Sequence, residues 1–310
     1  MPINVLFSAR AERWDQFERP LKSAFGEMGL DVNLSTSINP ADVDYVVYAP
    51  NGGLENFSPY TRTKAVLSLW AGVENIVGNK TLTQPLARMV DHGLTQGMVE
   101  WVSGHVLRHH LGMDIHIHGQ DGCWRGYFPP LAGNRRVAIL GLGELGLACG
   151  RALAGFGFPV CGWSRTKKNL RGITCHHGAD GLKSILSKAD ILVLLLPLTP
   201  ETESLLNAST ISMMPEGSFI INPGRGQHID DKALLEALDS GLIAHATLDV
   251  FRTEPLPVDH PYWQHPNVTV TPHIASETRA ATASQVIAEN IRRGEAGEPF
   301  LHLVDRELGY

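Results

Sequence analysis

Residues 137–146 read VAILGLGELG, in which four apolar residues run into glycines with the spacing G-x-G-x-x-G. After a strand of a parallel sheet, the first glycine permits a tight turn. The second lets the backbone approach a pyrophosphate, and the third lets the next helix pack on the strand. That helix should begin near residue 144 and present free N–H groups at the positive end of its dipole. The stretch predicts a dinucleotide-binding βα unit, with a plain structural turn as the alternative. The expected cofactor contacts are Gly141, Gly143, Glu144, Leu145 and Gly146.

The alternation of strand and helix continues toward the C-terminus. Strands are expected at residues 137–140, 159–163, 191–196, 218–222, 245–249 and 268–271. Helices are expected between them at residues 144–156, 182–189, 202–213 and 231–239. Regular repetition of this kind predicts a doubly wound parallel sheet with helices on both faces.

A smaller α/β domain is expected before this region. Its strand-like and helical stretches are residues 4–9, 13–28, 45–49 and 65–69, and a helix over 96–111 leads into the larger domain. The last helix, expected at 277–293, should pack back on the N-terminal part, since chain termini tend to lie close together. We predict an α/β protein of two Rossmann-like domains, each a doubly wound parallel sheet, with an active-site cleft between them. The predicted substrate domain is 1–96 plus 277–310, and the predicted dinucleotide-binding domain is 97–276.

Composition excludes several classes of protein. A net charge of −6 over 310 residues favours neither nucleic acid nor an anionic membrane as a partner. The longest apolar run, residues 191–198, is far shorter than the roughly 20 residues of a membrane-spanning helix. The N-terminus lacks a basic start followed by a long apolar region, which argues for a cytoplasmic protein. The four cysteines form no Cys-x-x-Cys pair and the fourteen histidines show no metal-ligand spacing, so no metal site is expected.

The end of the second strand of the larger domain indicates which cofactor is bound. An NAD site usually carries an acid here, about 20 residues after the glycines, that bonds the ribose 2′-hydroxyl. This chain has no carboxylate there and instead offers two hydroxyls, a guanidinium and two ammonium groups over residues 164–168. A guanidinium binds a 2′-phosphate through a fork of N–H donors. We therefore expect NADP(H) rather than NAD, and the alternative is a solvated basic turn. The expected phosphate contacts are Ser164, Arg165, Thr166 and Lys167.

Two further segments are expected beside the cofactor. The apolar run that ends in Leu196 and Pro197 is first of all a core strand, and its end is expected to wall the adenosine pocket. Asp249 ends another strand and could accept a hydrogen bond from the nicotinamide carboxamide. The alternative for Asp249 is a strand-end turn residue.

Three ionisable residues, Arg225, Glu254 and His273, each come after an apolar, strand-like run. Ligands of an open parallel sheet lie beyond the carboxyl ends of its strands. A cation, an acid and an imidazole are thus expected on the same edge as the dinucleotide site. This set suits proton-coupled hydride transfer to a small substrate that bears a carboxylate. Taken singly, each could equally be a surface arginine, a solvated loop acid or a strand-end histidine.

Short motifs follow one another in a specific order: GLGELG at 141–146, LPLTPET at 196–202, NPGRG at 222–226, LDVF at 248–251, EPLP at 254–257 and TPH at 271–273. With this set the chain resembles the D-isomer-specific 2-hydroxyacid dehydrogenases over essentially its whole length. A narrower likeness, to the NADPH-dependent glyoxylate/hydroxypyruvate reductase A group, rests on WSRT at 163–166, WQHP at 263–266 and the last seven residues.

The resemblance implies roles for these residues. Arg225 would hold the substrate carboxylate and keto oxygen, a task that suits the two-pronged guanidinium. His273 would be the general acid that protonates the keto oxygen. Glu254 would orient the imidazole and favour its charged form. Pro223 and Gly224 would line the cofactor.

The resemblance also places the substrate carboxylate against backbone N–H groups of Trp70, Ala71 and Gly72. Many relatives carry glycine at the position of Trp70. If its indole faces the pocket, small substrates are favoured, and if it packs under the loop it is part of the core. The turn over residues 51–53 is expected to border this pocket.

The resemblance implies an oxidoreductase that reduces glyoxylate and hydroxypyruvate with NADPH. One alternative is an enzyme of the same fold for a larger 2-hydroxy acid. The other is a nicotinamide-sensing binding protein without turnover. A homodimer is expected, with the arm at 116–134, which contains Trp124 and Tyr127, around the partner chain.

Overall fold

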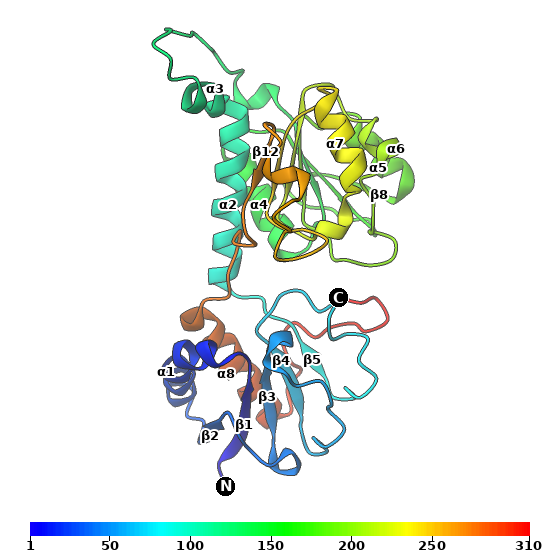
Figure 1. Ribbon diagram of the computed structural model, residues 1–310. Coiled ribbons are helices and arrows are strands. Elements are labelled where there is room, and N and C mark those ends of the chain that lie inside the picture. Colours follow the sequence, from blue (N-terminus) through cyan, green and yellow to red (C-terminus); the bar gives the residue numbers. More distant parts are fainter. The chain divides into compact units, whose positions relative to one another are not determined.

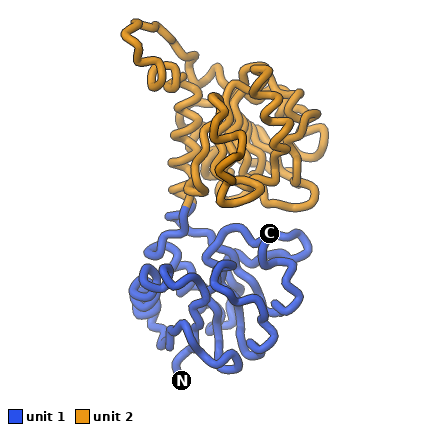
Figure 2. Tube along the Cα trace, viewed as in Figure 1, with its two compact units in different colours: residues 1–94, 277–310 blue, residues 95–276 orange.

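The computed structural model describes residues 1–310, and the chain forms two compact units (Figure 2). Unit 1 consists of residues 1–94 and 277–310, and unit 2 consists of residues 95–276. The functional division of the chain into a substrate domain and a dinucleotide-binding domain stays a prediction.

Unit 2 contains a seven-stranded sheet whose strands all pair in parallel. Its strands are β6 (Val137–Leu140), β7 (Val160–Ser164), β8 (Thr174–His177), β9 (Ile191–Leu194), β10 (Ser218–Asn222), β11 (Ile243–Leu248) and β12 (Val268–Val270). Their order is β12-β11-β10-β9-β6-β7-β8. The order reverses between β6 and β9, and the crevice beyond such a reversal is where open α/β sheets bind ligands.

Helices cover both faces of this sheet (Figure 1). One face packs against α2 (His92–Leu111) and α4 (Glu144–Gly155), with Val102 and Leu153 in the shared core. The opposite face packs against α5 (Gly178–Leu186), α6 (Ala208–Ile211) and α7 (Asp231–Asp239), with Leu186 and Leu234 in that core. Alternate side chains of each strand enter the two cores, because successive residues of a strand point to opposite faces. The predicted doubly wound architecture is confirmed.

Unit 1 is built on a five-stranded parallel sheet with the order β2-β1-β3-β4-β5. The strands are β1 (Ile3–Ser8), β2 (Val32–Ser35), β3 (Tyr45–Tyr48), β4 (Ala65–Ser68) and β5 (Leu86–Ala87). The helices α1 (Ala11–Glu27) and α8 (Ala280–Ala296) cover one face and contact each other. The last long helix therefore packs on the N-terminal part, as expected. Loop residues rather than α-helices cover the other face, among them Phe57, Ile76 and Leu82.

The prediction of a helix over residues 202–213 is wrong, because only α6 (Ala208–Ile211) is helical there. Thr202 donates from its hydroxyl to Pro197 O at 2.8 Å, and Ser204 has a left-handed backbone with φ of 48°. The side chain of Asn207 then caps α6 by accepting from the N–H groups of Ser209 and Thr210. Side chains that bond to nearby backbone compete with helix formation in this way. The sequence patterns also missed β2, β5 and β8.

The arm at 116–134 begins in the short helix α3 (Met113–His118) and has no regular element from residue 119 to 131. It then enters the 3₁₀ turn η3 (Ala132–Asn134) and is seen as the loop that extends from α3 in Figure 1. Trp124 is fully exposed on the arm, and Phe128 is 92% exposed.

The other 3₁₀ turns are η1 (Pro40–Asp42), η2 (Pro50–Gly52), η4 (Gly226–His228) and η5 (Pro261–Trp263).

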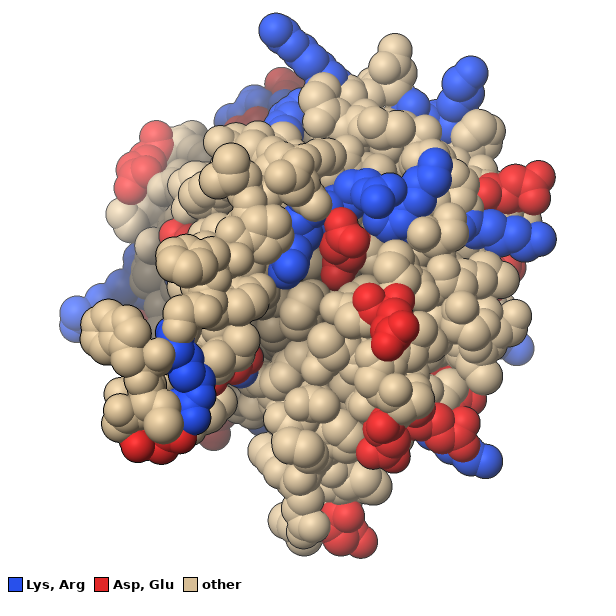
Figure 3. Space-filling model, turned by 90° about the horizontal axis from the view of Figure 1, so that it is seen from above, with Lys and Arg blue, Asp and Glu red and all other residues tan.

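Charges are mixed on the face of the molecule shown in Figure 3, where Lys and Arg lie beside Asp and Glu on a largely uncharged surface. No helix combines the length and the apolar character needed to cross a membrane. No group of three or more His, Cys, Asp or Glu side chains is arranged to hold a metal ion.

Candidate active site

The glycine turn has the geometry of a phosphate cradle. Gly141 has a φ of 104°, and a side chain on it would overlap with Leu195 O, just after β9. A side chain on Gly146 would overlap with Gly141 O, so α4 packs directly on the turn. Gly143 is the N-cap residue of α4 and no side chain caps the helix. Glu144 and Leu145 form its first turn, where N–H groups without intrahelical partners favour an anion.

The loop after β7 presents the predicted basic residues to solvent. Ser164 is buried and donates from its hydroxyl to Thr166 O at 2.8 Å, which bends the loop. Arg165, Thr166 and Lys167 are exposed. Lys168 donates from Nζ to Leu142 O at 2.6 Å. The basic loop is therefore tied to the glycine turn through a residue that lies outside the predicted set.

The other predicted cofactor residues border the same edge of the sheet. Leu196 is buried and follows β9, and Pro197 accepts a hydrogen bond from Thr202 through its carbonyl. Pro223 and Gly224 are buried just after β10. The side chain of Asn222 shapes their turn, because Oδ1 accepts from Gly224 N at 3.1 Å and Nδ2 donates to Arg225 O at 2.9 Å.

Asp249 is fully buried and holds the segment that carries His273. Its Oδ1 accepts from the hydroxyl of Thr271 at 2.6 Å and from Ile274 N at 2.9 Å, and its Oδ2 accepts from Ala275 N at 2.8 Å. Its backbone carbonyl accepts from His273 N at 2.8 Å. Sequence reasoning missed this contact set, although Thr271 stands in the quoted TPH motif. The hydrogen bond expected from a carboxamide to Asp249 stays a prediction.

His273 and Glu254 form a close pair, with 2.7 Å between His273 Nδ1 and Glu254 Oε2. The other oxygen of Glu254 accepts from Phe251 N at 2.9 Å. The hydrogen bond to Glu254 raises the pKa of His273 above its ordinary value, against the opposing effect of burial. Burial by itself would raise the pKa of Glu254, but the hydrogen bonds from His273 and Phe251 lower it on balance. The pair therefore favours an imidazolium beside a carboxylate, with Nε2 of the ring on the side away from Glu254.

Arg225 is half-buried at the start of η4 and donates from Nη1 to Gly224 O at 2.6 Å. Its positive charge lowers the pKa of both Glu254 and His273. The next residue, Gly226, packs directly against the backbone of residues 251–252, in the loop that carries Glu254. The three ionisable residues expected on one edge are thus brought together in unit 2. Their catalytic roles stay predictions.

Trp70, Ala71 and Gly72 lie in unit 1, directly after β4, and all three are half-buried. Trp70 N donates to Ser68 Oγ at 3.0 Å, and Trp70 O accepts from Met89 N at 2.9 Å, so both ends of this residue's backbone are held. The Trp70 side chain contacts the core beneath α1 and α8 and also lines a cavity of about 630 Å³. The effect of the indole on substrate size stays a prediction.

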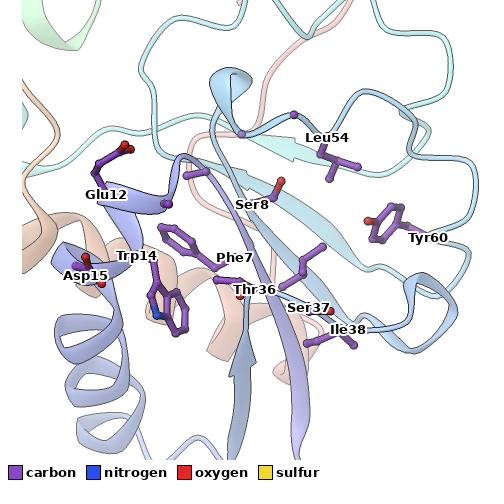
Figure 4. A pocket seen from close by; sticks show the side chains of 15 residues that line it. Phe7, Ser8, Glu12, Trp14, Asp15, Thr36, Ser37, Ile38, Leu54 and Tyr60 are labelled. Carbon is purple, nitrogen blue, oxygen red and sulfur yellow. The ribbon is translucent and has the colours of Figure 1, made fainter.

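A second hollow of unit 1, of about 760 Å³, lies at the end of β1 (Figure 4). The first turn of α1 brings Glu12 to one side of it, and Leu54 lies on the opposite side. Phe7 and Trp14 meet edge to face in its wall, with ring centroids 5.5 Å apart. The turn at residues 51–53 borders both hollows, since its two glycines line this one and its asparagine lines the smaller one.

Comparison with known proteins identifies the family. Residues 105–275 match the family described as D-isomer specific 2-hydroxyacid dehydrogenase, NAD binding domain. The glyoxylate/hydroxypyruvate reductase A of Serratia proteamaculans is 40% identical over 279 residues, which cover 87% of this chain and 88% of that protein. The chain belongs to the D-isomer-specific 2-hydroxyacid dehydrogenase family.

Solved structures of similar proteins agree with this family assignment. A D-isomer-specific 2-hydroxyacid dehydrogenase from Xanthobacter autotrophicus, in complex with NADPH and MES, is 40% identical over 100% of both chains with a TM-score of 0.93. The NADPH-dependent glyoxylate/hydroxypyruvate reductase of Sinorhizobium meliloti, in complex with NADP and sulfate, is 34% identical and covers 100% of this chain and 99% of its own, with a TM-score of 0.87. The predicted family and the predicted fold are confirmed, and the dehydrogenase is an oxidoreductase that uses a nicotinamide dinucleotide.

Proposed function

We propose that the protein reduces glyoxylate and hydroxypyruvate to the corresponding 2-hydroxy acids, with NADPH as the hydride donor. The observation that carries this proposal is the 2.7 Å contact between His273 and Glu254, beside Arg225 and in the same unit as the glycine turn. A charged imidazole beside a guanidinium suits a substrate that carries a carboxylate and gains a proton as it is reduced.

The residues of unit 2 fit NADPH. The glycine turn and the start of α4 offer backbone N–H groups to the pyrophosphate. No carboxylate ends β7, and Arg165 and Lys167 are exposed beside Ser164, where a 2′-phosphate would be held by charge-assisted hydrogen bonds. When bound, NADPH supplies the hydride that adds to the keto carbon.

The protein residues supply binding and the proton. Arg225 holds the carboxylate and the keto oxygen of the substrate. His273 gives the proton on Nε2 to the oxygen that becomes the hydroxyl. The ring is then a neutral imidazole. Glu254 keeps Nδ1 of the ring hydrogen-bonded, so it fixes both the ring orientation and the nitrogen that releases the proton. In oxidation, neutral His273 takes the proton back.

NADPH oxidation, followed by nicotinamide absorbance with glyoxylate or hydroxypyruvate as acceptor, tests the proposal. We expect turnover with both acids, and a higher kcat/KM with NADPH than with NADH. His273→Ala should lose about 10²–10⁴-fold in kcat, the usual contribution of a general acid, while it binds NADPH as the wild type does. Cofactor binding without turnover in the wild type would contradict the proposal and indicate a sensing protein.

The arm supports a homodimer as part of the proposed function. Trp124, Phe128 and Leu131 are strongly exposed along it, and Ile117 is exposed on α3. An apolar surface of this kind on a protein monomer marks an interaction site. A second copy of the chain is the expected partner.

We also propose that the protein acts in the cytoplasm. Its four cysteines are all free, including Cys123 on the exposed arm. Free thiols persist in the reducing environment of the cytoplasm, which also contains the NADPH that the reaction consumes.

A further inference from the structure

Arg252 lies two residues before Glu254 and donates to two backbone carbonyls and one hydroxyl. Its Nε donates to Ile229 O at 3.0 Å, and its Nη2 donates to the same oxygen at 2.7 Å. Nη2 also donates to Ser204 Oγ at 2.8 Å and to Gln227 O at 3.3 Å. The side chain of Arg252 is one-third exposed, and its two bonds to Ile229 O are partly buried.

These partners connect Arg252 to the segment that follows Arg225. Gln227 lies within η4, and Ile229 directly follows that turn. The backbones of the two loops are also in direct contact, because a side chain on Gly226 would overlap with the backbone of residues 251–252. The guanidinium and the close backbone contact therefore hold the loop of Arg225 and the loop of Glu254 at a fixed spacing.

Glu254 transmits this position to His273. One oxygen of Glu254 accepts from Phe251 N, next to Arg252, and the other contacts His273 Nδ1. A displacement of the segment that carries Glu254 would move the carboxylate relative to the imidazole. The charged groups that act on His273 are Glu254, Arg225 and Asp249. The last of these is held by its own buried hydrogen bonds.

We propose that Arg252 is a positioning residue for the reaction, which sets the spacing between the substrate-binding guanidinium of Arg225 and the Glu254–His273 pair. This inference rests on the proposed function, in which those groups bind and protonate the substrate. Arg252 itself touches neither substrate nor cofactor in this scheme.

A different role for Arg252 would be charge neutralisation alone. Two carboxylates flank it, with Nη1 at 3.8 Å from Glu203 Oε1 and Nε at 3.9 Å from Asp231 Oδ2. Lysine would serve these two charges about as well as arginine. It would not reproduce the bonds to the three neighbouring acceptors, because a single ammonium lacks the planar fork of the guanidinium. The variant Arg252→Lys therefore separates positioning from charge.

The experiment compares wild type, Arg252→Met, Arg252→Lys and the control Arg292→Met. Arg292 in α8 is similarly exposed and pairs with Glu289 and Glu298, each at 2.8 Å, but lies outside unit 2. The first measurement is kcat/KM for hydroxypyruvate with NADPH, well below the melting temperature of each variant. The second is the titration of His273, followed by NMR of the full-length protein labelled with ¹³C at histidine Cε1 and assigned with His273→Gln.

We expect both Arg252 variants to lose about tenfold to a hundredfold in kcat/KM, the scale of a misplacement near 1 Å, while the control keeps the wild-type value. The pKa of His273 should fall in both, because Glu254 is no longer held against the imidazole. Wild-type kcat/KM and titration in Arg252→Met would overturn the inference, as would full rescue by Arg252→Lys.

Two further outcomes are informative. A melting temperature that falls with both readouts unchanged would show a purely structural role for Arg252 and would also overturn the inference. Wild-type protein without turnover would refute the proposed function, and the titration would still show whether Arg252 sets the contact between Glu254 and His273.

Discussion

Replacing Glu254 by Gln tests the proposed acid more directly than removal of His273 does. The substitution keeps the size of the side chain and an oxygen that can accept from His273 Nδ1, but it removes the negative charge. The 2.7 Å hydrogen bond to Glu254 is the largest cause of the raised pKa of His273. The pKa should therefore move back down toward the ordinary value for histidine.

The structure sets the scale of the loss. A hydrogen bond to a charged group contributes roughly 1.5–3 kcal/mol, and a neutral amide oxygen in the same place keeps only part of this. The side chains of His273 and Glu254 are 50% and 35% exposed, so solvent screening favours the lower end of that range. A loss of about 1.4 kcal/mol in transition-state stabilisation is about tenfold in rate. We expect kcat/KM for hydroxypyruvate to fall about tenfold near neutral pH.

The pH dependence of kcat/KM shows in which direction the substitution Glu254→Gln moves the titration of His273. Reduction requires the charged imidazole, so kcat/KM is highest below the pKa of His273 and falls as the pH rises through it. In Glu254→Gln this falling limb should move to lower pH, and the loss should shrink in acid, where both proteins are protonated. In oxidation the neutral imidazole is the base, so the rising limb should move to lower pH as well. A pH profile of kcat/KM in both directions measures this. A loss of equal size at every pH, with the limb in its wild-type place, would refute the reasoning.

Three further changes test other parts of the proposal. Arg165→Ser should raise KM for NADPH at least about tenfold and leave KM for NADH unchanged, since only NADPH carries the 2′-phosphate; equal effects on both cofactors would count against this role. Trp70→Gly should raise kcat/KM for bulky 2-keto acids relative to glyoxylate in a substrate panel, and an unchanged ratio would show that the indole does not limit the pocket. Trp124→Ser should shift the sedimentation coefficient toward that of a monomer, and a variant that sediments like the wild type would remove the arm from the interface.

The parts of the fold that could be predicted from the sequence are those with strong local signals. The apolar run 137–140 with its glycines predicts β6, the turn and α4, because the backbone at Gly141 has a positive φ that other residues rarely adopt. The strands β10 and β11 and the helix α7 are similarly marked by apolar runs and by periodicity. The residues that follow β10 and β11 then lie on one edge by topology alone, since parallel strands place their carboxyl ends together.

The parts that could not be predicted depend on contacts between distant residues. β8 reads Thr-Cys-His-His and has no buried residue, so its sequence shows no strand pattern, and it forms because its backbone pairs with β7. The helix expected from residue 202 does not begin there, because Thr202 bonds to Pro197 O instead. The contacts of Asp249 to residues 271–275 join two segments more than 20 positions apart, and no local motif reports them.

The backbone of His273 shows why these distant contacts matter for function. Its φ of 55° is left-handed, a conformation that costs roughly 1–2 kcal/mol for a residue with a side chain. Asp249 offsets this cost, because its buried carboxylate accepts hydrogen bonds from Thr271, Ile274 and Ala275 on both sides of the histidine. A change of backbone conformation at this position would move the imidazole relative to Glu254. Strain that is held by surrounding groups is typical of functional sites. The left-handed conformation of His273 therefore supports the proposal that residues 271–275 serve mainly to fix the direction of the imidazole.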